Sequence, residues 1–178
     1  MQRILVHFPF EEKPVSVVDA VQQPSGRTVN AISWSANCKF FSLSLGKVIA
    51  SGDSLGNILL SSEEGTKLHT FKANLTKRIP VNDIIFSGKS ESLIYGMADG
   101  ALKVWDSKEK KEIHSLYPFG NYPLKTLCLD QINNRILAIG NAVGQIGIYN
   151  FQNLISGRNG MFKDQEIKPL RISLQNQS

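Results

Sequence analysis

The sequence predicts an all-β fold built from repeated four-stranded units, and three observations lead to this class. Pairs of glycines recur every 44 residues, alternating apolar residues follow each pair, and the middle copy closes on Val104-Trp105-Asp106. The glycines are Gly52 and Gly56, Gly96 and Gly100, and Gly140 and Gly144. A period in the low forties that closes on Trp-Asp is typical of a β-propeller blade.

Each repeat carries signals for strands in a meander, which is how a propeller blade is built. Apolar residues fall at every second or third position in these segments, as half-buried strands require. The expected strands are 29–35, 48–50, 58–60 and 67–71, then 81–87, 93–95, 102–104 and 112–116, then 124–130, 136–139 and 146–148. We therefore predict three blades, at 29–71, 81–116 and 124–150, within a propeller region that spans 29–157.

Several residues are expected to serve this architecture. Gly56, Gly100 and Gly144 fall in the turn between the second and third strands, where glycine allows a positive φ without steric cost. Trp105 is expected to pack between blades, and Asp106 to start the turn after the third strand.

Asp99 is expected to bond nearby backbone amides from the turn before Gly100. The matching positions hold Leu55 and Val143, which cannot accept such bonds. The flanking blades are therefore predicted to be less firmly pinned than the middle one.

The pattern is incomplete at both ends. Residues 1–28 are predicted to be an N-terminal strand and a linker, because 4–10 resembles the fourth strand and loop at 113–119. Residues 158–178 are predicted to be a loop and, at 168–174, the first strand of an incomplete further blade. Propellers close with roughly four to eight blades. About three blades therefore indicate either a piece of a longer protein or an assembly with other blades.

One spacing departs from the repeat. Trp34 and Phe86 are 52 residues apart, whereas Phe86 and Leu129 are 43 apart. The excess of about eight residues lies around 40–47. It is interpreted as an insertion between the first two strands. The insertion is either a true loop or an artefact of splicing or of the gene model, and the sequence does not choose between these origins.

Composition indicates a globular chain of 178 residues with a net charge of +5, which permits an acidic partner without specifying one. No apolar run approaches the roughly 18 residues of a spanning helix. The first ten residues do not resemble a secretory signal. Cys38 and Cys128 are far apart and are expected to be buried, reduced thiols. Together these features favour a cytoplasmic or nuclear protein and argue against a membrane partner.

The motifs of common enzymes and cofactor sites are missing, so no catalytic residue, cofactor or metal ligand is predicted. His7, His69 and His114 each fall in an expected fourth strand and are interpreted as structural. No helix is expected after the glycine pairs, so no nucleotide site is expected there. No small-molecule substrate is expected.

The candidate partner-binding residues are Lys72, Lys77 and Arg78, in the loop between the first two blades. Inter-blade loops of this kind lie on a face where propellers commonly bind partners. A second basic group, at 108–111, alternates with acidic residues and is interpreted as a solvated turn. Aromatic residues do not alternate with either group, so nucleic acid is not expected as a partner.

Over 29–174 the order of motifs resembles the WD-repeat propellers. The resemblance is clearest in Tyr95-Gly-Met-Ala-Asp-Gly-Ala-Leu-Lys-Val-Trp-Asp106. The flanking repeats close on Ser61-Ser62 and Tyr149-Asn150, and the Gly-His pair common in the family is missing from every repeat.

The first blades look like those of the centrosomal members of the family that target the γ-tubulin ring complex. The shared motifs are Asn30-Ala-Ile-Ser-Trp-Ser-Ala-Asn37, Ser54-Leu-Gly-Asn-Ile-Leu-Leu-Ser-Ser62, and Val104-Trp-Asp-Ser-Lys-Glu-Lys-Lys111 with His114-Ser-Leu116. The Ser-Ser close is the most informative element.

The resemblance implies a non-enzymatic protein that anchors microtubule nucleation at centrosomes and spindles. In that family the propeller mediates localisation, and a separate C-terminal region binds the γ-tubulin complex. This chain has no counterpart of that region, so only targeting is expected of it, with γ-tubulin complex-associated or microtubule proteins as partners. The alternative is a WD-repeat scaffold or adaptor in another assembly, such as ubiquitin ligation or RNA processing.

Overall fold

A computed structural model of the chain describes residues 3–6, 16–19, 28–35, 47–87, 92–130 and 132–151. Every secondary-structure element with assigned bounds in these ranges is a β-strand. The predicted strand at 168–174, residues 40–46 of the excess, His7 and Cys38 lie outside the described residues.

Three antiparallel meander sheets form the body of the molecule, and each is called a blade below. Blade one contains β3 (Val29–Trp34), β4 (Val48–Asp53), β5 (Asn57–Ser62) and β6 (Lys67–Lys72). Blade two contains β7 (Val81–Phe86), β8 (Ser92–Met97), β9 (Leu102–Asp106) and β10 (Lys111–Leu116). Blade three contains β12 (Leu124–Leu129), β13 (Ile136–Asn141) and β14 (Ile146–Asn150). The prediction of an all-β fold with about three blades is confirmed.

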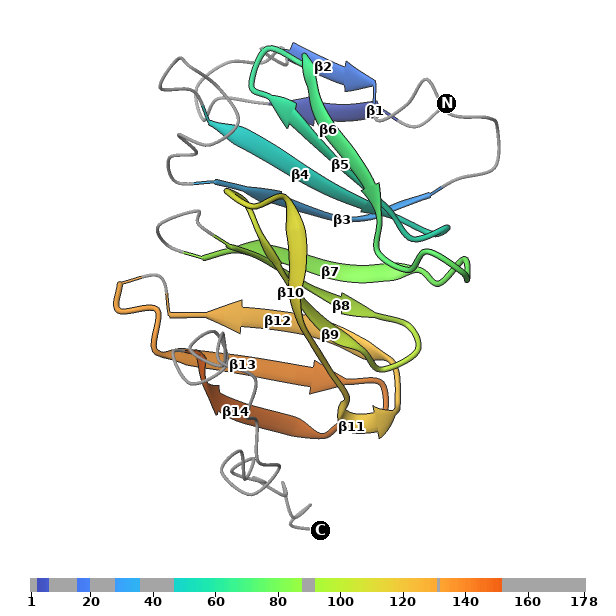
Figure 1. Ribbon diagram of the computed structural model, residues 1–178, viewed down its shortest axis with the longest axis vertical. Coiled ribbons are helices and arrows are strands. Elements are labelled where there is room, and N and C mark those ends of the chain that lie inside the picture. Colours follow the sequence, from blue (N-terminus) through green and yellow to red (C-terminus); the bar gives the residue numbers. More distant parts are fainter. Residues whose placement is uncertain are drawn as a thin grey trace, which may run out of the picture.

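The blades follow one another along the long axis of the molecule, with the first strands β3, β7 and β12 side by side (Figure 1). One hydrophobic core lies between blades one and two, and a second lies between blades two and three. Each blade therefore has a backward face toward the preceding blade and a forward face toward the next. Forward-face residues in these cores include Ala50, Ile58 and Leu60 of blade one and Ile94, Leu102 and Val104 of blade two; backward-face residues include Ile84 and Phe86 of blade two and Leu127 and Leu129 of blade three.

The two glycines of each pair have different structural roles. In blades one and two the first glycine permits close approach to the next blade: a β-carbon on Gly52 would lie 2.5 Å from Val81 Cγ1, and one on Gly96 would lie 3.1 Å from Leu124 Cβ. The second occupies the turn with a positive φ, which is +79° at Gly56, +89° at Gly100 and +81° at Gly144. The prediction of positive φ in these turns is confirmed.

The 44-residue period also appears in the backbone hydrogen bonds. In each blade, an amide just after the second strand donates to the carbonyl that precedes the first strand. The bonds run from Ser54 to Thr28 (2.9 Å), from Ala98 to Pro80 (3.0 Å) and from Ala142 to Pro123 (2.9 Å). The same contact therefore ties the turn of each blade to the start of its own first strand.

Two short strands were not expected from the sequence. The first is β2 (Ser16–Asp19). It pairs with β1 (Arg3–Val6) in a separate two-stranded sheet, in a region where the sequence suggested a single strand. β11 (Pro118–Asn121) lies in the connection between blades two and three.

The prediction that the flanking blades are less firmly pinned is wrong. Asp99 Oδ1 accepts one turn bond, from Ala101 N at 3.1 Å. In blade one, Asp53 Oδ1 accepts bonds from Leu55 N (2.9 Å) and Asn57 N (2.8 Å). In blade three, Asn141 Oδ1 accepts bonds from Val143 N (3.1 Å) and Gln145 N (2.9 Å). In the flanking blades, the residue after the first glycine therefore accepts the hydrogen bonds that hold the turn.

The prediction that Cys128 is buried is also wrong, because its side chain is exposed. The alternation of β12 places Leu127 and Leu129 in the core and turns Cys128 to the forward face. Strand periodicity therefore outweighs the general preference of cysteine for the interior.

Candidate protein-interaction groove

A hollow of about 540 Å³ lies between blades one and two and is called the inter-blade groove below. Its walls come from the end of β6, the loop that follows β6, and the facing strands β8, β9 and β10. The lining residues are Phe71, Lys72, Ala73, Asn74, Leu75, Thr76, Tyr95, Lys103, Trp105, Lys110, Lys111 and Glu112. The groove is therefore formed by segments that are distant in sequence.

Stacked aromatic rings form the floor of the groove. Trp105 of blade two lies parallel to Phe71 of blade one, with ring centroids 4.6 Å apart and an interplanar angle of 7°. The His69 ring lies on the same indole at 5.6 Å, and Tyr95 meets Phe71 edge-on at 6.2 Å. Trp105 thus lies between two blades, and such ring pairs add to the stabilisation by apolar burial.

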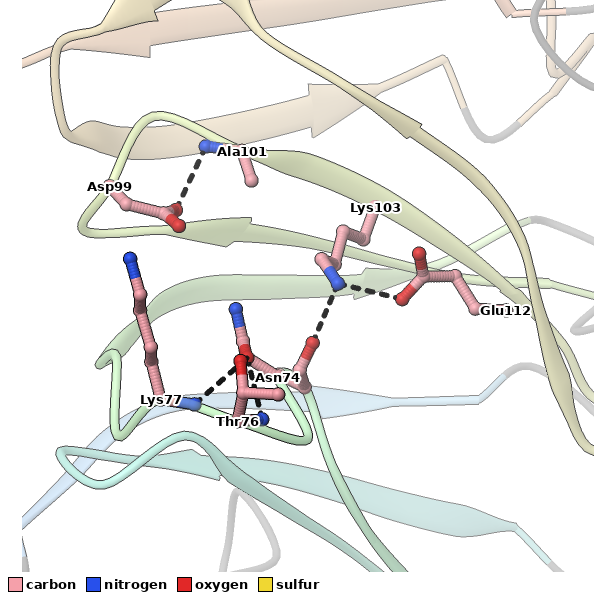
Figure 2. A network of polar contacts seen from close by, with 8 residues as sticks. Asn74, Thr76, Lys77, Asp99, Ala101, Lys103 and Glu112 are labelled. Carbon is pink, nitrogen blue, oxygen red and sulfur yellow. Dashed lines mark hydrogen bonds and ion pairs between the residues drawn. The ribbon is translucent and has the colours of Figure 1, made fainter.

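Lys103 joins the two sides of the groove (Figure 2). Its Nζ donates to the carbonyl oxygen of Ala73 at 2.8 Å and pairs with Glu112 Oε2 at 2.8 Å. Its side chain is only 12% exposed, so this cation depends on both partners. The contact holds the loop after blade one against blade two.

Asn74 shapes the loop that carries the predicted binding residues (Figure 2). Its Oδ1 accepts hydrogen bonds from Thr76 N, Thr76 Oγ1 and Lys77 N, each at 3.0 Å. This turn directs the chain into Lys77 and Arg78. Figure 2 draws Lys77 pointing away from Lys103 and toward the turn that contains Asp99.

The structure brings Lys72, Lys77 and Arg78 together around a smaller hollow of about 140 Å³ beside the groove. All three are exposed, and the same hollow is lined by Leu55 and Asn57 of blade one. Lys72 lines both hollows, so the predicted basic cluster continues into the inter-blade groove.

Sequence reasoning missed Lys110 and Lys111 at the opposite edge of the groove. The group at 108–111 was interpreted as a solvated turn, and this remains so for Lys108, which is exposed and does not line the groove. Lys111 is only weakly paired, with Glu109 at 3.8 Å. No local signal reveals this placement, because it depends on the packing of blade two against blade one.

Tyr95 of the floor and His69 beside it have pKa values shifted toward their uncharged forms. Burial raises the pKa of Tyr95 well above its usual range, and the neighbouring Glu112 carboxylate raises it further. Burial, and secondarily the positive charge of Lys110, lower the pKa of His69 below its ordinary value of 6.5. The groove therefore combines a neutral aromatic floor with a rim on which cations outnumber carboxylates.

The other predicted signature residues are dispersed. The Asp106 side chain is buried, and its Oδ1 accepts bonds from Lys108 N and Glu109 N, both at 2.8 Å, in the turn after β9. The paired glycines lie in β4, β8 and β13 and in the turns that follow these strands, and they join no common site.

Among the described residues, no group of three or more His, Cys, Asp or Glu side chains is arranged to hold a metal ion. The described part of the chain also contains no helix with the length and apolarity needed to cross a membrane. Comparison with protein-family models finds no match, and neither does a sequence comparison with curated proteins.

Proposed function

We propose that this chain is a non-enzymatic protein-interaction module whose inter-blade groove binds an acidic segment of a partner protein. The observation that carries the proposal is the basic rim over the aromatic floor. Lys72, Lys77, Arg78, Lys110 and Lys111 border the two adjoining hollows. The carboxylate of Glu112 is paired with Lys103, so it offsets little of the positive charge of these five residues.

Charge and shape both favour a polypeptide partner. Carboxylates of an acidic segment match the rim lysines, and Arg78 can bind a carboxylate through two parallel hydrogen bonds. The apolar edges of Phe71 and Leu75 offer contact area for a side chain of the partner.

We further propose that the partner belongs to the microtubule-nucleation machinery and that the chain acts in recruiting the γ-tubulin ring complex to centrosomes and spindles. The support is the resemblance of 30–37, 54–62 and 104–116 to the centrosomal WD-repeat proteins, together with the blade architecture. Co-sedimentation of the full chain with purified γ-tubulin ring complexes and with microtubules tests this assignment. Retention by neither would refute the assignment and leave a scaffold of another assembly.

Charge reversal tests the groove itself. The triple variant Lys72→Glu, Lys77→Glu, Arg78→Glu is expected to weaken binding of the retained partner at least about tenfold, because attraction becomes repulsion. The matched control is Lys67→Glu, Lys108→Glu, Lys125→Glu, which changes three exposed cations that do not line either hollow. Equal binding by the two triple variants would remove the groove from the mechanism.

A further inference from the structure

The forward face of blade three exposes apolar side chains at positions that are buried wherever two blades meet. Ile146 is 40% exposed, whereas its repeat equivalents Ile58 and Leu102 are 0% exposed. Ala138 and Ile148 of the same face are half-buried, whereas their equivalents in blade two, Ile94 and Val104, are 0% exposed. Blade three thus presents the surface that blades one and two cover with a following blade.

The backward face of blade one shows the complementary feature. Ile32 and Trp34 of β3 are 46% and 43% exposed. Their equivalents in blade two, Ile84 and Phe86, are 1% and 3% exposed, because blade one covers them. Ile49 of β4 is buried, so the uncovered part of this face is the strip along β3.

These two surfaces are the halves of a contact that the chain already makes twice. In each inter-blade core, the forward face of one blade packs against first-strand residues on the backward face of the next. The forward face of blade three and the β3 strip of blade one are therefore complementary in kind, although they lie at opposite ends of the stack (Figure 1).

We propose that a second copy of this chain covers both surfaces, with blade three of each copy packed against blade one of the other. The contact joins unlike surfaces, so it must either close into a ring or continue as a filament. Three blades from each copy give six, besides the β1–β2 sheet that each copy also carries, and six is within the roughly four to eight blades of closed propellers. A two-fold ring buries both open surfaces of both copies in two identical interfaces.

Sedimentation equilibrium of the full chain tests the proposal. The expected species is a dimer that dissociates on dilution. The variants Trp34→Asp and Ile146→Asp are each expected to be monomeric, because either substitution places a charge in both interfaces of the ring. Tyr117→Asp is the control, since Tyr117 is comparably exposed at 52% but lies in the connection between blades two and three.

Mixing the two variants separates a ring from other assemblies. A dimer of one Trp34→Asp chain and one Ile146→Asp chain has one interface with both substitutions and one with neither. An equimolar mixture is therefore expected to recover dimers that neither variant forms alone, with a dissociation constant higher than that of the unsubstituted chain. Far-UV circular dichroism of each variant establishes that the strand content is retained.

Three results would overturn the proposal. The first is an unsubstituted chain that stays monomeric at all accessible concentrations. The second is growth into larger species with concentration, which indicates an open filament. The third is a mixture of folded variants that remains monomeric.

Discussion

At the scale of single residues, the second glycine of each pair meets different surroundings in different blades. A β-carbon on Gly100 would collide with the backbone of Gly120 and lie 2.9 Å from Tyr122 O. A β-carbon on Gly144 would meet nothing within 4 Å among the described residues. Both residues have a positive φ, so backbone strain is common to the two sites and the collision is particular to Gly100.

Alanine substitution separates these two effects. Gly144→Ala is expected to lower the free energy of unfolding by about 1–2 kcal/mol, the cost of a left-handed conformation for a residue with a side chain. Gly100→Ala is expected to cost clearly more, because the backbone of β11 must also move. Urea denaturation of both variants measures the difference, and equal losses would contradict the proposed packing of the blade-two turn on β11.

The sequence predicted the positive φ of the turn glycines, because glycine is the residue that such turns favour. It did not predict the roles of Asp53 and Asn141. An Asx side chain can reach the amides of a turn from more than one position, and alignment on Asp99 directed attention to Leu55 and Val143.

At the scale of elements, strand β6 of blade one packs on β9 of blade two through His69, Phe71 and Trp105. The lowered pKa of His69 means that the unfolded chain binds this proton more readily than the folded chain. As the pH falls below about 6.5, the free energy of unfolding therefore decreases. The decrease is complete once the pH is below the pKa of His69 in the folded chain. Stability is predicted to be higher at pH 7.5 than at pH 5.5 because of this group.

Tryptophan fluorescence measures this effect. The chain has two tryptophans, so Trp34→Phe leaves Trp105 as the single reporter beside the imidazole. In that background, His69→Gln is expected to reduce the dependence of the unfolding midpoint on pH between 7.5 and 5.5. An unchanged dependence would show that other groups cause it.

Most strands could be predicted because apolar alternation is a local property. β11 could not, because Pro118 and Gly120 are poor strand residues and this segment is held by contact with the turn at Gly100. Only part of the candidate site could be predicted, because only part of it is formed by residues that are close in sequence. Lys72, Lys77 and Arg78 share one loop, whereas Lys110 and Lys111 reach the groove only through the packing of two blades.

At the scale of the whole molecule, the blades form a stack in which each contacts only its neighbours, as in repeat proteins. Blade two contributes to both hydrophobic cores, whereas blades one and three contribute to one each. Loss of packing in different blades should therefore destabilise different parts of the stack. Damage to blade three leaves the first core intact, but damage to blade two weakens both.

Leu93 and Leu137 allow this to be tested, because they are equivalent residues 44 positions apart and both are 0% exposed. Each leucine-to-alanine change is expected to cost about 2–5 kcal/mol by leaving a cavity. Hydrogen exchange is measured in the Trp34→Asp background to keep the chain monomeric. Leu93→Ala is expected to speed exchange mainly in blades one and two, because Leu93 belongs to the core that these two blades share. For Leu137→Ala the increase is expected to be concentrated in 124–150, with β4 and β8 remaining protected, because the core between blades one and two contains no part of blade three. The same exchange pattern in both variants would mean that the blades unfold as one cooperative unit, contrary to a stack stabilised by nearest neighbours.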